Sequence, residues 1–261
     1  MPKRAPSVLS FGSRILDAVH YGTIRSFGDL NTTGDLSATR MRAFGDSEIQ
    51  GRCSVKHLFT AGNVQIHESL RTESLRSFGN VIVHGQLTAA QLRIFGDLSA
   101  TGRVNCHQIK LWGDAHLSEN LVAETVKLTG SCRIDGLVSA ERIQIRSRGS
   151  CEINEIGGTT ITIRAGWNED GCAQDKSFLN WRCKGTTRVQ LIEGDCIYLE
   201  NTTADIVRGQ TVTLGRGCRI AALEYGEKLS QHPSSEVGCA RRIAPSEDQR
   251  QHAHPTGGHD E

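Results

Sequence analysis

Glycine recurs along this chain at one fixed spacing. Every step in the series is 17 residues, and its members are Gly28, Gly45, Gly62, Gly79, Gly96, Gly113 and Gly130. Most of them follow an aromatic residue and precede Asp or Asn, as in Phe95-Gly96-Asp97. A fixed period of this kind is the signature of a solenoid, in which each repeat packs only on its two neighbours.

Apolar and polar residues alternate in three short runs within each repeat. Counted from the glycine, the apolar places are +2 and +4, +8 and +10, and +13 and +15. Place +8, for example, holds Leu36, Cys53, Leu70, Leu87, Val104, Leu121 and Val138. Alternation with a period of two indicates a strand with one buried face. The sequence therefore predicts an all-β fold, a single-domain parallel β-helix whose triangular coils are 17 residues long.

The period also bears on the handedness of the coil. Left-handed hexapeptide helices favour a coil of about 18 residues. A strict period of 17 therefore favours the right-handed form.

An aromatic residue precedes the glycine in five of the repeats. We expect these rings to stack as a ridge that stabilises the corners of the coils. They are Phe27, Phe44, Phe78, Phe95 and Trp112.

The pattern divides the chain into parts. Residues 1–21 are expected to contain an N-terminal segment and the first coil, and residues 22–225 the parallel β-helix. Residues 166–185 fit no coil and predict a side loop. Residues 226–261 are polar and aperiodic, which predicts a disordered tail.

Charge and cysteine usage exclude several classes of protein. Thirty basic and 29 acidic side chains give a formal charge of +1, so no overall field attracts the chain to nucleic acid. No stretch approaches the roughly 20 apolar residues of a membrane span. The nine cysteines include no C-x-x-C pair, which argues against a zinc site or a disulfide framework. We expect a cytoplasmic protein with reduced thiols.

The C-terminal part of the repeat region contains a more specific pattern. It consists of Ile-Glu-Gly-Asp-Cys-Ile-Tyr-Leu-Glu-Asn-Thr at 192–202, Ala204 to Gly209, Val212 to Gly215, and Cys218 to Ile220. Together with Glu155-Ile156-Gly157-Gly158 and the 17-residue repeat, it resembles the bactofilin family in its Firmicutes branch. The resemblance covers roughly residues 22–225.

This resemblance implies a right-handed parallel β-helix that assembles end to end into apolar, nucleotide-independent filaments. It also implies a position often on the inner face of the cytoplasmic membrane, and relatives in this branch are linked to cell shape and motility. The chain departs from the family in its aromatic-glycine corners, the loop at 166–185 and a His-rich tail.

No catalytic, cofactor or metal site is predicted, and we expect no enzyme. Gly157-Gly158 lacks the Lys-Ser/Thr that a nucleotide-binding loop requires. His67 and His84 share place +5 in adjacent repeats, but the repeat puts no carboxylate or thiol beside them, which favours a solvated pair over a metal site. Place +1 is the ordinary turn position for an acidic residue, and it holds Asp29, Asp46, Asp97 and Asp114.

The cysteines fall into two groups. Cys53, Cys106 and Cys132 occupy inward places, where a cysteine acts as a small hydrophobe. Cys172 and Cys183 belong to the predicted loop, where inert thiols are favoured over a redox-active or intersubunit pair.

The ends of a solenoid expose unpaired backbone groups and an apolar cross-section. Neither end of this repeat region has a charged amphipathic cap in its sequence, so we expect the ends to mate with one another, making the chain its own partner in a homopolymer. The predicted polymer contacts are Phe11, Ile15, Leu16 and Ile24 in the first coil, and Ile220, Leu223 and Tyr225 in the last.

The loop at 166–185 suggests a second, weaker hypothesis of contact with the membrane surface. Its apolar residues suit an interfacial position, although packing against the solenoid flank is favoured over it; they are Trp167, Phe178, Leu179 and Trp181.

The sequence thus predicts a structural protein that polymerises into a scaffold without nucleotide or nucleic acid. The alternative is a monomeric β-solenoid platform that binds a partner protein. An acyltransferase-like or polysaccharide-acting enzyme is disfavoured because the coils are uniform and offer no convergent polar cleft.

Overall fold

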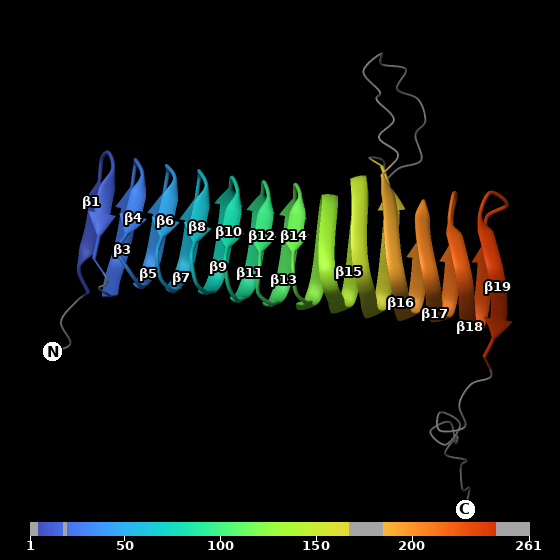
Figure 1. The fold of residues 1–261 in the computed structure, drawn as a ribbon. Coiled ribbons are helices and arrows are strands. Elements are labelled where there is room, and N and C mark those ends of the chain that lie inside the picture. The colour runs from blue at the N-terminus through green and yellow to red at the C-terminus, as the bar shows by residue number, and fades with distance from the viewer. Residues whose placement is uncertain (1–4, 18–19, 167–184, 244–261) are drawn as a thin grey trace, which may run out of the picture.

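The structure, a computed structural model, describes residues 5–17, 20–166 and 185–243. These residues form one sheet of 19 parallel strands that winds into an elongated solenoid, with no helix among them (Figure 1). This confirms the predicted parallel β-helix, while the right-handed sense of the coil stays a prediction. The strands are β1 (Ser7–Ser10), β2 (Arg14–Leu16), β3 (His20–Ser26), β4 (Leu30–Thr32), β5 (Leu36–Ala43), β6 (Ser47–Ile49), β7 (Cys53–Thr60), β8 (Val64–Ile66), β9 (Leu70–Phe78), β10 (Val81–Val83), β11 (Leu87–Phe95), β12 (Leu98–Ala100), β13 (Val104–Trp112), β14 (Ala115–Leu117), β15 (Leu121–Ala165), β16 (Thr186–Leu199), β17 (Thr202–Leu214), β18 (Arg219–Gln231) and β19 (Glu236–Arg242).

Each coil in the N-terminal half consists of one short strand and one long strand, such as β10 followed by β11. Residues pair with the residue 17 positions later, as Leu87 does with Val104. Backbone groups are strong hydrogen-bonding groups that must find partners when buried. A coil satisfies them only through the coils on either side, so the strands form no isolated unit.

The long strand turns a corner in its middle. In β11 the buried residues are Leu87 and Ala89, then Leu92 and Ile94, so the alternation skips one residue between the two pairs. The ladder of paired residues also omits Ala90 at this point. The three predicted runs are therefore confirmed as three buried faces, but two of them belong to one continuous strand.

The inward side chains stack as columns of apolar residues along the axis. Leu92 pairs with Ile109, and both are fully buried. Residues of one column repeat in size because each is packed against its own equivalent in the next coil. The result is a narrow, continuous core without a second layer.

The predicted end of the solenoid at residue 225 is wrong. β18 continues to Gln231, and β19 adds a further strand that pairs with it, Ile220 with Val237 and Leu223 with Ala240. Most β19 side chains are exposed, so the sequence there lacks the apolar alternation on which the prediction relied. Residues 244–261 of the predicted tail lie outside the described residues.

The coil length changes in the C-terminal half. Ser150 pairs with Thr186, a step of 36 residues that includes the predicted side loop. Thr187 then pairs with Thr202, a step of only 15. The loop itself lies outside the described residues, apart from Gly166 and Gly185.

Glycine is required where neighbouring coils approach most closely. Gly158 pairs with Gly194, and Gly194 with Gly209, so these glycines stack in one column. A Cβ atom on Gly158 would collide with the carbonyl oxygen of Ala140. The glycines of the C-terminal pattern are therefore explained by packing between coils.

Replacing Gly158 by Ala should destabilise the fold, whereas the same change at Gly157 should not. The Cβ of Gly158→Ala meets backbone that cannot move aside, and overpacking of this kind costs about 1–3 kcal/mol. At Gly157 an added Cβ meets only the Cδ1 atom of Leu137 at 3.8 Å, an ordinary contact. Urea unfolding of both variants measures the difference, and equal free energies of unfolding would contradict this explanation of the column.

Candidate functional site

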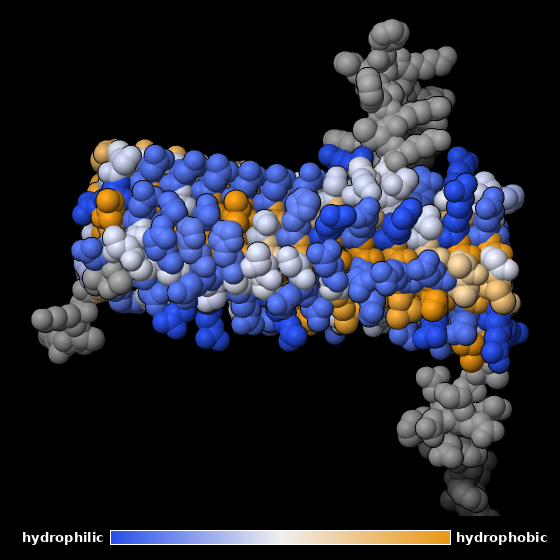
Figure 2. All heavy atoms as spheres, in the orientation of Figure 1, coloured by the Kyte–Doolittle hydropathy of each residue, from blue (hydrophilic) through white to orange (hydrophobic). Residues whose placement is uncertain are grey.

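The N-terminal end of the solenoid is formed by β1 and β2. Among the described residues β1 pairs only with β3, and β2 only with β4, so no strand lies along their outer edges. Three large apolar side chains are exposed here: Leu9 by 56%, Phe11 by 78% and Ile15 by 68%. Figure 2 shows hydrophobic atoms at the surface of this end.

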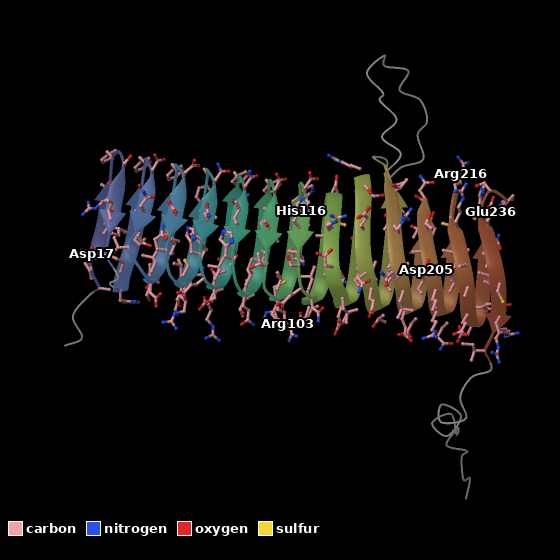
Figure 3. All side chains as sticks on the ribbon, viewed as in Figure 1. Asp17, Arg103, His116, Asp205, Arg216 and Glu236 are labelled. Atoms are coloured by element: carbon pink, nitrogen blue, oxygen red, sulfur yellow. The ribbon has the colours of Figure 1, made fainter. Side chains whose placement is uncertain are left out.

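The C-terminal end is formed by β19, which pairs only with β18 within the described part of the chain. Its side chains are mostly polar and exposed, among them Glu236, which Figure 3 places at this end, and Arg241 and Arg242. Residues 228–231 of β18 also have no described strand beyond them. Both ends therefore present backbone groups without a strand partner, but only the N-terminal end is markedly apolar.

The structure separates the predicted polymer contacts into exposed and covered residues. Phe11 and Ile15 are exposed at the N-terminal end. The remaining five do not form an end surface, because they lie inside the first coils or beneath β19; they are Leu16, Ile24, Ile220, Leu223 and Tyr225. The placement of the last three in a terminal coil is wrong, since the sequence of β19 was not recognised as a strand.

The predicted aromatic ridge is confirmed and is longer than the sequence indicated. Phe27 and Phe44 stack with ring centroids 5.0 Å apart, and Phe95 and Trp112 with centroids 4.6 Å apart. Phe11 extends the ridge by stacking on Phe27 at 5.2 Å. Sequence reasoning missed Phe11 because the first coil is one residue shorter than the others, as the pairing of Arg14 with Leu30 shows.

Phe59 is a further member of this ridge that the repeat did not indicate. The repeat has Ala61 before Gly62, where other coils have an aromatic residue. Phe59 fills the gap, with its ring 5.6 Å from that of Phe44 and 6.0 Å from that of Phe78. The ridge is therefore continuous across the coil that lacks a corner aromatic.

The acidic residues at place +1 are structural, as expected, although their partners are not the local turn. Asp97 accepts a hydrogen bond through Oδ1 from the backbone N–H of Asp114 at 2.9 Å. Asp46 accepts one from Asn63 in the same way, at 2.8 Å. Each side chain thus ties one coil to the same place in the next coil, and none of these carboxylates is directed at a site.

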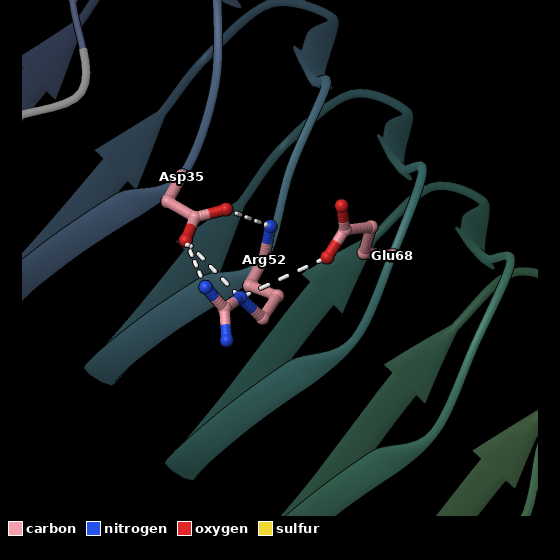
Figure 4. A network of polar contacts seen from close by, with 3 residues as sticks. All are labelled: Asp35, Arg52 and Glu68. Atoms are coloured by element: carbon pink, nitrogen blue, oxygen red, sulfur yellow. Dashed lines mark hydrogen bonds and ion pairs between the residues drawn. The ribbon is translucent and has the colours of Figure 1, made fainter.

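An exposed ion pair bridges the next corner of the coil (Figure 4). Asp35 accepts hydrogen bonds from the backbone N–H of Arg52 at 2.8 Å and from its Nη2 atom at 2.8 Å, while Glu68 lies 3.7 Å from Arg52 Nε. The backbone N–H and then the guanidinium of Arg52 lower the pKa of the Asp35 carboxyl below its ordinary value. Exposed pairs of this kind contribute little to stability.

The two histidines at place +5 lie side by side, with ring centroids 5.4 Å apart. The expectation that no carboxylate lies near them is wrong, since Glu48 Oε1 is 3.0 Å from His67 Nε2. Glu48 comes from the neighbouring coil and an outward place whose residue type does not repeat, so the pattern could not reveal it. The described residues contain no group of three or more side chains able to hold a metal ion.

The inward cysteines pack as small hydrophobes, as predicted. Cys53 and Cys132 are buried, and Cys106 packs against the core. Burial raises the pKa of Cys53 to about 12 and that of Cys106 to about 12, so neither thiol ionises near neutral pH. The pKa of Cys132 is raised by a hydrogen bond with Cys151 and by burial.

Several predicted features fall outside the described residues. They include the tail histidines His252, His254 and His259, the loop cysteines Cys172 and Cys183, and the predicted membrane contacts Trp167, Phe178, Leu179 and Trp181. Membrane contact through the loop therefore stays a prediction. In the described part of the chain, no helix has the length and hydrophobicity needed to cross a membrane.

Truncation of Phe95 should weaken the fold because its ring lies between those of Phe78 and Trp112. Phe95→Ala loses two stacking contacts, each contributing about 0.5–1.5 kcal/mol. Phe95→Tyr keeps the ring and serves as the control. Chemical unfolding followed by Trp112 fluorescence should show a lower free energy of unfolding for the alanine variant alone, and equal values for both variants would contradict the stacking role.

Arg52→Gln should raise the pKa of Asp35 towards its ordinary value without fully restoring it, because the backbone N–H bond remains. A pKa that is lowered by folding contributes stability above the unfolded-state value, which is lost as pH falls through the folded-state value. Acidification should therefore remove more stability from the wild type than from the variant. Carboxyl NMR titration measures the shift, with Lys56→Gln, whose partner is Glu73, as the control; an unchanged Asp35 pKa in Arg52→Gln would refute the assignment.

Comparison with known proteins gives relatives without an assigned role. No family model matches the chain, and no solved structure does. Two relatives come from Bacillus subtilis (strain 168): the uncharacterized protein YhbF is 39% identical over 103 residues, covering 39% of this chain and 40% of YhbF, and the uncharacterized protein YhbE is 32% identical over 111 residues, covering 41% and 44%. The chain thus spans about two fifths of the length of these curated relatives.

Proposed function

We propose that this protein is a structural scaffold that associates end to end through the two ends of its β-solenoid. The observation that carries the proposal is the pair of strand edges at β1 with β2 and at β19, beside which no described strand lies. The role is structural rather than catalytic, and assembly takes no nucleotide.

Open strand edges are templates for pairing with another chain. In this fold the edges lie at opposite ends of one axis (Figure 1). Contacts between coaxial ends do not close into a ring, so they propagate along the axis. A second molecule that pairs with β1, β2 or β19 would extend the ladder that joins all 19 strands of the sheet.

The apolar character of the N-terminal end supports the same proposal. Leu9, Phe11 and Ile15 are all more than half exposed, and large apolar side chains that cluster at an open edge are typical of an interaction surface. Phe11 also presents one free ring face, since its described aromatic contact is with Phe27. An aromatic side chain from a second molecule could continue the ridge there.

Charged residues at the N-terminal end should weaken assembly. In Leu9→Lys/Ile15→Lys, two lysines at the edge oppose pairing with another chain, as lysines do on natural edge strands. Thr101→Lys/Val122→Lys adds the same charge at exposed positions in the middle of the solenoid and serves as the control. Sedimentation and negative-stain electron microscopy across protein concentrations should show filaments for the wild type and the control, and soluble folded protein for the end variant.

Two outcomes would reject the proposal. Filaments formed equally by the end variant would exclude these contacts. A wild-type protein that is monomeric at every concentration would favour the alternative function, a monomeric platform that binds a partner protein along its flank.

A further inference from the structure

One flank of the solenoid carries a row of basic side chains. The row runs through the second half of the long strands, where each residue pairs with its equivalent in the next coil. Its members are Arg25, Arg42, Phe59, Arg76, Arg93, Lys110 and Lys127. All but Phe59 are cationic, although the whole chain has a formal charge of only +1. We refer to these seven residues as the basic row.

The rows on either side of the basic row hold no acidic residue that would neutralise it. One side is the aromatic ridge, and the other side holds Thr23, Arg40, His57, Ser74, Gln91, Gln108 and Thr125. Like charges on directly paired residues destabilise a sheet. A surface that stacks cations without a counter-charge is therefore suited to an anionic ligand.

The basic row is interrupted at one place, and the interruption forms a hollow. Phe59 leans towards the aromatic ridge, where it fills the gap above Ala61. Its place in the row is left open between Arg42 and Arg76. The resulting hollow measures about 410 Å³, and its lining includes Arg40, Arg42, His57, Phe59, Ser74 and Arg76.

The polar groups of the hollow are arranged to donate hydrogen bonds. His57 Nδ1 lies 3.0 Å from Ser74 Oγ, which leaves its other ring nitrogen free of any described partner. Arg76 lies over the ring of Phe78, with Cζ 5.4 Å from the centroid. Arg40, Arg42 and Arg76 form no ion pair among the described residues.

We propose that this hollow binds a phosphate group. Arg42 and Arg76 lie two coils apart, about 10 Å along the axis, so their guanidinium groups reach one phosphate from opposite sides. Planar guanidinium groups bind phosphate oxygens in a bidentate manner. Arg40, His57 and Ser74 supply further donors, and the ring of Phe59 forms the apolar floor. The remainder of the basic row raises the local concentration of anions.

The phosphate group belongs either to a small phosphomonoester or to a lipid headgroup, and two probes distinguish these sources. Calorimetric titration with glycerol 3-phosphate tests the first. Flotation with phosphatidylcholine vesicles, with and without phosphatidic acid, tests the second. The wild type should bind at least one phosphate-bearing probe saturably, and binding of neither probe would overturn the proposal.

Two variants test the residues of the hollow. Arg42→Gln/Arg76→Gln should weaken binding by at least about tenfold, because each lost charged hydrogen bond contributes about 1.5–3 kcal/mol. Arg71→Gln/Arg103→Gln removes the same charge elsewhere and should bind as the wild type does; Arg103 lies at the corner before β13 (Figure 3). An equal loss in both variants would overturn the proposal, since it would reflect total charge alone.

A third variant separates the shape of the hollow from its charge. Ser74→Tyr fills the hollow without changing any charge and should reduce binding at least about tenfold by steric exclusion of the ligand. Circular dichroism and thermal unfolding verify that each variant is folded. Undiminished binding by Ser74→Tyr would show that the hollow is not the site. The test is independent of end-to-end assembly because all of these residues lie on the flank.

Discussion

The hydrogen bonding between successive coils is the interaction on which the rest of this structure depends. A coil has no backbone partners of its own and forms its ladder only with the coils before and after it. Because the pairing is parallel and steps by 17 residues through most of the N-terminal half, each side chain lies on its equivalent in the next coil. Apolar columns, the aromatic ridge, the Asp–backbone bonds and the glycine column all follow from this single register.

The same ladder explains why the ends of the molecule are its most reactive part. Every internal strand has partners on both sides, whereas β1, β2 and β19 have one described partner strand each. A globular domain can bury its edges by folding a loop or helix over them, but a solenoid grows along one axis and leaves an edge at each end. The proposed scaffold function uses this property of the architecture and requires no special residue chemistry.

The flank behaves differently, because there a departure from the repeat creates the feature of interest. Stacking of equivalent residues would place a cation between Arg42 and Arg76, and the chain has Phe59 instead. The ring satisfies the aromatic ridge in the coil where Ala61 interrupts it, and a hollow lined by basic side chains results. One substitution within a regular array thus links the packing of the ridge to a binding site for an anion.

The sequence by itself determined the period, the three buried faces and the residues of most columns, because the period of the glycines and the alternation of apolar residues depend only on local spacing. It also indicated the aromatic ridge, since five of its rings repeat with the glycines. Only the tertiary structure decided that β19 continues the solenoid, that Glu48 lies beside His67, and that Phe59 joins the ridge and opens a hollow. The physical reason is that backbone pairing needs no apolar side chain, and contacts between outward residues of different coils leave no periodic signal in the sequence.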